Sequence, residues 1–123
     1  MADVLIVDDD RLLRTMLADA LADVPCTVRE ASSGDAALAA IAEKPPQVVL
    51  LDLVMPGKSG LDLLKTLSAK YPDMRVIVIS SLDTESLVQQ ARSDGAHGFL
   101  SKPFHPLDVQ NVVRAALEAA AAS

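Results

Sequence analysis

The feature that most constrains the fold is the stretch VVLLDLVMPGKSG, which runs from Val48 to Gly60. It begins with four apolar residues, and such a run between turn-forming residues is typical of a strand buried on both faces of a parallel sheet. The run ends at Asp52, whose carboxylate is costly to bury unless it faces a crevice, a partner or a metal ion. Pro56 and Gly57 then turn the chain. We therefore predict that Asp52 lies at the carboxyl edge of an open α/β sheet, where such folds bind ligands.

Short apolar runs alternate with helical patterns along the whole chain. The runs predict strands at about 4–7, 26–29, 48–51, 75–79 and 98–100. Apolar residues at helical spacing, together with capping and breaking residues, predict helices at about 11–23, 34–44, 60–70, 84–93 and 106–117. Five strands alternating with five helices predict a doubly wound parallel sheet with right-handed crossovers and helices on both faces, a three-layer α/β/α architecture.

Size and composition favour one globular domain over residues 1–123, in which residues 118–123 form a tail or the start of a linker. Half of the residues are hydrophobic and only 2% are aromatic, so the core must consist of aliphatic side chains. The net charge of −6 argues against sequence-independent DNA binding by this domain.

The sequence also carries signals of its compartment. Cys26 is the single cysteine, so no internal disulfide can form, and a buried, reduced thiol is expected. The first residues lack the pattern of a signal peptide, and no apolar run approaches the ~20 residues needed to span a bilayer. We expect a cytoplasmic protein that makes no membrane contact.

Polar side chains follow the ends of four predicted strands. Asp8 and Asp9 follow the first strand, Asp52 ends the third, Ser80 ends the fourth and Lys102 follows the fifth. If the first and third strands are neighbours, three carboxylates converge at one edge of the sheet. A divalent cation with a preference for hard oxygen ligands, such as Mg²⁺, would relieve their repulsion. Together with the lysine and the hydroxyl, this set favours phosphoryl transfer with Asp52 forming an aspartyl phosphate. The adjacent Asp10 is predicted to cap the first helix rather than to bind the metal.

These motifs, in this order, resemble the receiver domain of two-component response regulators, the CheY-like family. The resemblance rests on the acidic pair after VLIV, the pattern D-x-x-M-P-x-x-x-G that begins at Asp52, the serine after VIVI, and GFLSKP at residues 98–103. It covers the whole chain and implies the strand order 2-1-3-4-5. It also implies that Asp52 accepts a phosphoryl group from a phosphohistidine on a sensor histidine kinase or a histidine phosphotransfer protein.

The resemblance further implies a role for each residue of the site. Asp9 and Asp52 would bind Mg²⁺ directly with the backbone carbonyl of Val54, and Asp8 would hold the metal through water. Lys102 would pair with the phosphoryl group and Ser80 would hydrogen-bond to it. The chain would then be a stoichiometric phosphoacceptor with self-catalysed transfer and slow autodephosphorylation, rather than an enzyme.

The family also implies a conformational switch. Ser80 would move toward the phosphate and Phe99 would swing inward, which repositions the face built by the fourth helix, fifth strand and fifth helix. A plain core aromatic is the alternative for Phe99. A downstream protein target would bind this face, and the chain would be a monomer or a weak phosphorylation-dependent dimer. The peptide bond between Lys102 and Pro103 is cis in the family, and the sequence leaves the isomer open.

Three positions depart from the commonest family pattern. Ser81 stands where a smaller residue is usual and would narrow access to Asp52. Val54 and Leu82 are apolar at positions where polar groups of relatives orient the hydrolytic water. We predict a long-lived phosphoryl-Asp52, because apolar side chains offer an attacking water no hydrogen bond.

Other functions fit the sequence less well. A degenerate receiver that acts only by docking would not need the complete acidic, serine and lysine set. An aspartyl-phosphate phosphohydrolase of the haloacid dehalogenase type usually has a second aspartate where this chain has Val54, and the chain lacks room for a cap domain. A flavodoxin-like nucleotide binder would need a glycine-rich loop after the first strand. A stand-alone receiver is favoured over a segment cut from a longer protein.

Overall fold

The computed structural model describes residues 2–54, 60–80 and 85–122. These residues form a parallel sheet in the order β2-β1-β3-β4-β5, which is the order that the resemblance to receiver domains implied. The strands are β1 (Ala2–Val7), β2 (Cys26–Ala31), β3 (Val48–Asp52), β4 (Arg75–Ser80) and β5 (Gly98–Ser101). The helices are α1 (Arg11–Ala20), a 3-10 turn η1 (Leu21–Asp23), α2 (Gly34–Glu43), α3 (Gly60–Lys70), α4 (Glu85–Ser93) and α5 (Pro106–Ala122).

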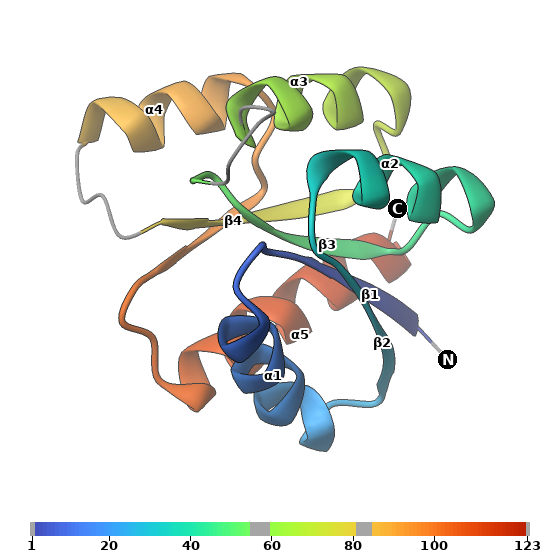
Figure 1. The fold of residues 1–123 in the computed structure, drawn as a ribbon, viewed down its shortest axis with the longest axis vertical. Coiled ribbons are helices and arrows are strands. Elements are labelled where there is room, and N and C mark those ends of the chain that lie inside the picture. The colour runs from blue at the N-terminus through green and yellow to red at the C-terminus, as the bar shows by residue number, and fades with distance from the viewer. Residues whose placement is uncertain (1, 55–59, 81–84, 123) are drawn as a thin grey trace.

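Helices cover both faces of the sheet. Figure 1 shows α2, α3 and α4 on one face and α1 with α5 on the other. Side chains alternate along each strand, so Leu5 and Val7 belong to the core cluster under the first group while Val4 and Ile6 belong to the cluster under the second. The central strand β3 is buried over its whole length, which explains its continuous apolar run.

The strand register brings the carboxyl ends of the central strands together. Val7 of β1 lies opposite Leu51 of β3, so the residue after Val7 lies beside Asp52. Asp52 in turn lies opposite Ile79 of β4. The three-layer fold therefore delivers the polar residues after β1, β3, β4 and β5 to one edge of the sheet.

The predicted helix boundaries needed two adjustments. The helical pattern over residues 11–23 ends in a 3-10 turn, since Pro25 disfavours a helical conformation at Val24, whose amide bonds instead to the Leu21 carbonyl at 3.0 Å. At the other end of the chain, α5 continues to Ala122, because the alanine-rich segment is an excellent helix former. Among the described residues, no helix is long and apolar enough to cross a membrane.

Candidate functional site: an acidic cluster and a lysine at the sheet edge

Three carboxylates meet where β1 and β3 end. Asp8 and Asp52 are buried, with exposed fractions of 1% and 2%, whereas Asp9 is exposed. Ligand oxygens of the three side chains all lie within 4.8 Å of one another. The structure thus brings together the acidic residues that the strand ends predicted.

Lys102 completes the cluster from the end of β5. Its Nζ lies 2.9 Å from Oδ2 of Asp52, while Oδ1 of Asp52 accepts a hydrogen bond from the Val54 amide at 3.0 Å. The Lys102 amide donates to the Ser80 carbonyl at 3.0 Å. This bond extends the β4–β5 pairing by one residue and fixes the position of the Lys102 backbone. The bond between Lys102 and Pro103 is cis. Asp52 is therefore a buried carboxylate that pairs with the Lys102 ammonium and has a defined orientation.

Burying the Asp8 carboxylate beside a second acidic side chain carries an electrostatic cost. Burial is the largest cause that raises the pKa of its carboxyl, from 3.8 to about 6. A hydrogen bond from the Asp10 amide to Oδ1, at 2.9 Å, lowers the pKa and offsets part of this effect. The negative charge of Asp52 raises the pKa further. The ionised form of Asp8 is consequently disfavoured relative to the protonated form, compared with an ordinary aspartate.

The cluster fits a hard divalent cation. Oδ2 of Asp8 is buried and has no hydrogen-bond partner within the described part of the chain. A buried carboxylate oxygen without a partner is costly, and a bound cation would satisfy it. The available donors are carboxylate oxygens, which suit Mg²⁺ better than a softer metal.

The remaining predicted site residues lie on β4, on β5 and just after β3. Ser80 ends β4 opposite Ser101 and is half-buried. The Val54 side chain is 59% exposed beside Asp52. Phe99 is partly buried against the core, and the guanidinium of Arg92 in α4 lies 5.2 Å from the centre of its ring. Ser81 and Leu82, to which further predictions refer, lie outside the described residues.

The motif that follows Asp52 requires a glycine at position 60. It is the first residue of α3 and packs against the backbone of Leu53, so an added Cβ would lie 2.5 Å from the Leu53 Cα. Only glycine allows α3 to approach the end of β3 this closely. The residue therefore fixes the distance between the helix and the site.

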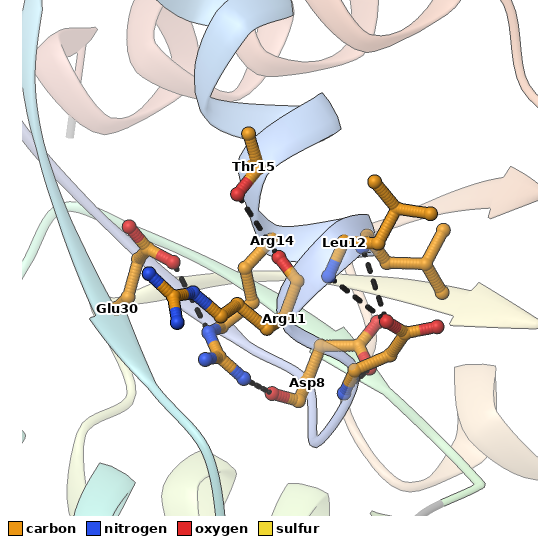
Figure 2. A network of polar contacts seen from close by, with 8 residues as sticks. Asp8, Arg11, Leu12, Arg14, Thr15 and Glu30 are labelled. Carbon is orange, nitrogen blue, oxygen red and sulfur yellow. Dashed lines mark hydrogen bonds and ion pairs between the residues drawn. The ribbon is translucent and has the colours of Figure 1, made fainter.

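Asp10 caps the first helix, as predicted, whereas the contact that Arg14 makes with the acidic loop was not predicted from the sequence. Oδ1 of Asp10 accepts hydrogen bonds from the Leu12 amide at 2.9 Å and the Leu13 amide at 3.5 Å. Arg14, one turn into α1, donates from Nη1 to the Asp8 carbonyl at 2.7 Å (Figure 2). A basic residue one turn after an acidic loop was the available signal, but a helical arginine is more often ordinary surface.

The chain is similar to a known protein family and to several characterised proteins. Residues 4–114 match the family model described as the response regulator receiver domain. The chemotaxis protein CheY of Thermotoga maritima is 36% identical over 104 residues, which cover 84% of this chain and 87% of that protein. The DNA-binding transcriptional regulator NtrC of Azospirillum brasilense is 35% identical over 116 residues, which cover 94% of this chain and 24% of that protein.

Solved structures agree with the fold. A crystal structure of NtrX from Brucella abortus superposes with a TM-score of 0.91 at 35% identity and covers 97% of this chain. The match covers 28% of the NtrX chain. This chain therefore spans only about a quarter of the NtrC and NtrX relatives, but most of the CheY relative.

Proposed function

Because this chain belongs to the response regulator receiver family, we propose that it is a phosphoacceptor of a two-component or phosphorelay system, with Asp52 as the residue that receives the phosphoryl group. The observation that carries the proposal is the geometry around Asp52. The carboxylate is buried, lies 2.9 Å from the Lys102 ammonium, and shares an edge of the sheet with two further carboxylates. A receiver that only docked a partner would not need this costly arrangement.

In the proposed reaction, a carboxylate oxygen of Asp52 forms the new bond to phosphorus. The phosphorus–nitrogen bond of the donor phosphohistidine breaks, and its electron pair leaves on the imidazole. Lys102 is already within ion-pair distance of Asp52, so it is placed to neutralise phosphoryl oxygens as they arrive. Ser80 would hydrogen-bond to the product phosphoryl group from the neighbouring strand.

Mg²⁺ is the proposed cofactor, held directly by Asp9, Asp52 and the Val54 carbonyl and through water by Asp8. When bound, the ion would supply positive charge that stabilises the phosphoryl oxygens in the transition state. The unpartnered oxygen of Asp8 supports this assignment, because it needs a cation or a water bound to one. Each chain would accept one phosphoryl group and lose it slowly, so it would not turn over as an enzyme.

The proposed donor is a sensor histidine kinase or a histidine phosphotransfer protein of the cytoplasm. A hollow of about 330 Å³ beside the site is lined by Lys102 and by mainly apolar residues, namely Leu13, Met16, Pro103 and Phe104. Leu12 and Met16 of α1 are 67% and 45% exposed next to it. Exposed apolar surface of this kind favours a protein partner over a free small molecule as the physiological donor.

The proposed output is a change of the face formed by α4, β5 and α5. Phe99 lies on β5 between the core and Arg92 of α4, so a shift of its ring would alter contacts of that helix. A target protein would recognise the altered face, as a monomer or through weak dimerisation of the receiver.

The test is the intact mass of the chain after incubation with Mg²⁺ and acetyl phosphate. We expect one phosphoryl adduct that is labile to base and hydroxylamine, and that is absent from Asp52→Asn and from samples with chelator. If acetyl phosphate yields no adduct, a purified phosphohistidine donor is the second arm. Absence of an adduct with both donors, or an unchanged adduct in Asp52→Asn, would refute the proposal.

A further inference from the structure

Arg14 connects three segments that meet at the acidic cluster. Its Nη1 donates to the carbonyl of Asp8 at 2.7 Å, and its Nε donates to Oε1 of Glu30 at 3.1 Å (Figure 2). Asp8 follows β1, Arg14 belongs to α1 and Glu30 belongs to β2. The Arg14 side chain is 14% exposed, and its contact with the Asp8 carbonyl is better shielded from water than its contact with the exposed Glu30 carboxylate.

The contact with the Asp8 carbonyl fixes the orientation of a peptide unit within the acidic pair. The carbonyl of Asp8 and the amide of Asp9 belong to one rigid plane, so holding the oxygen also sets the direction in which Asp9 leaves it. The Asp8 amide is held separately, by the Ala31 carbonyl at 3.1 Å, and Oδ1 is held by the Asp10 amide. None of these bonds uses Oδ2 of Asp8, which is buried and has no hydrogen-bond partner among the described residues.

We propose that Arg14 is a positioning residue of the cation site, which acts through the Asp8 carbonyl to hold the carboxylates of Asp8 and Asp9 toward Asp52. The inference rests on the proposed function, since it assumes that this cluster takes Mg²⁺. Arg14 does not contact the cation in this view. Arg14 would instead orient the acidic residues that hold the cation, as hydrogen-bond partners of metal ligands commonly do.

Electrostatics alone predicts the opposite effect. A guanidinium near a cation site repels the cation, so removing its charge should strengthen Mg²⁺ binding. Loss of positioning should weaken it instead. The direction of the change in Mg²⁺ affinity therefore separates the two roles of Arg14.

The alternative role for Arg14 is a purely structural one, in which it only forms an ion pair with Glu30. Glu30 is 45% exposed, and an ion pair with a partner this accessible contributes little to stability. Glu30→Gln keeps an oxygen that can accept from Nε and leaves the Asp8 contact intact. It is the matched control for the pair itself.

The experiment is a Mg²⁺ titration of the ¹⁵N-labelled full chain, followed by the amide shifts of residues 8–10. The variants are Arg14→Met, Arg14→Gln and Glu30→Gln, and Arg11→Met removes an exposed positive charge from the same helix. Circular dichroism during thermal unfolding, without Mg²⁺, verifies that each variant is folded. Arg14→Gln keeps helix propensity and polarity, so it serves if Arg14→Met does not fold.

We expect both Arg14 variants to raise the Mg²⁺ dissociation constant by about tenfold or more. Arg11→Met and Glu30→Gln should stay within about twofold of the native chain. Unchanged or tighter binding in a folded Arg14 variant would overturn the inference, as would an equal loss in Glu30→Gln. If the native chain bound no Mg²⁺, both the proposed cation site and the role of Arg14 would be refuted. If the native chain bound Mg²⁺ and the Arg14 variants bound it equally well, only the role of Arg14 would be refuted.

Discussion

Asparagine in place of Asp8 is expected to stabilise the metal-free protein. The Asp8 carboxylate is 1% exposed and one of its oxygens lacks a hydrogen-bond partner among the described residues. Asparagine has nearly the same shape and keeps an oxygen that can accept from the Asp10 amide. The substitution therefore removes a buried, repelled charge without leaving a cavity.

The size of the effect follows from the raised pKa of Asp8. Burial, partly offset by the Asp10 amide and reinforced by the charge of Asp52, raises this pKa from 3.8 to about 6. Such a rise corresponds to a loss of about 3 kcal/mol in the free energy of unfolding once the group is ionised. Between pH 3.8 and about pH 6 the folded chain binds more protons than the unfolded chain, so the free energy of unfolding falls as the pH rises. The penalty is small below pH 4, reaches about half its size at pH 5, and is complete above about pH 7.

The assay is urea unfolding followed by circular dichroism, because the chain has no tryptophan. Native protein and Asp8→Asn are compared in chelator at pH 5 and pH 7.5, with Asp73→Asn as a control for loss of an exposed carboxylate. We expect Asp8→Asn to gain about 2–3 kcal/mol at pH 7.5 and about half of that at pH 5. Added Mg²⁺ should reduce the gain, because it relieves the native cluster. A variant that is no more stable than the native chain, or a gain that does not depend on pH, would refute the reasoning.

Three further perturbations test other parts of the molecule. Val54→Asn combined with Leu82→Glu should speed the loss of phosphate from Asp52, because polar groups can orient the attacking water; an unchanged or slower decay of the phosphorylated mass would contradict this prediction. Gly60→Ala should destabilise the fold by about 2 kcal/mol in urea unfolding, since its Cβ would collide with the backbone beside Asp52, and a neutral effect would show that α3 can shift freely. Asp3→Asn should lower the free energy of unfolding by about 2 kcal/mol, because it leaves a partly buried guanidinium without its counter-charge, and a stabilising effect would count against this account.

Much of the fold could be predicted because local pattern and tertiary structure agree. The apolar run before Asp52 predicts a fully buried strand, and β3 is buried throughout. Polar residues after strands predict one functional edge, and the register brings Asp8 beside Asp52. Only the boundaries moved, as at Leu21–Asp23, where a proline beyond the helix tightens its last turn into a 3-10 geometry.

The contacts within the site were not available from sequence. No pattern specifies that Arg14 reaches the Asp8 carbonyl, because that contact depends on where α1 lies relative to β1. Nor does the sequence reveal that Gly60 touches the backbone of Leu53, since the approach of α3 to β3 is a product of packing. The sequence predicted which polar residues follow the strands, whereas their relative orientation depends on the assembled sheet.

The two ends of β1 show why burial of a carboxylate does not by itself mark a functional site. Asp3 is 3% exposed, yet it accepts from Arg29 Nε at 2.8 Å and from the Thr27 hydroxyl at 3.1 Å, and Arg29 also donates to the Ala40 carbonyl near the end of α2. Its charge is balanced within the fold, so it ties β1 to β2 and α2. Asp8 is buried to a similar degree, but one of its oxygens has no hydrogen-bond partner in the described part of the chain. Replacing Asp3 or Asp8 with asparagine should therefore change the free energy of unfolding with opposite signs, because Asp3 has its charge balanced by a neighbouring guanidinium whereas Asp8 keeps a buried oxygen without a partner among the described residues.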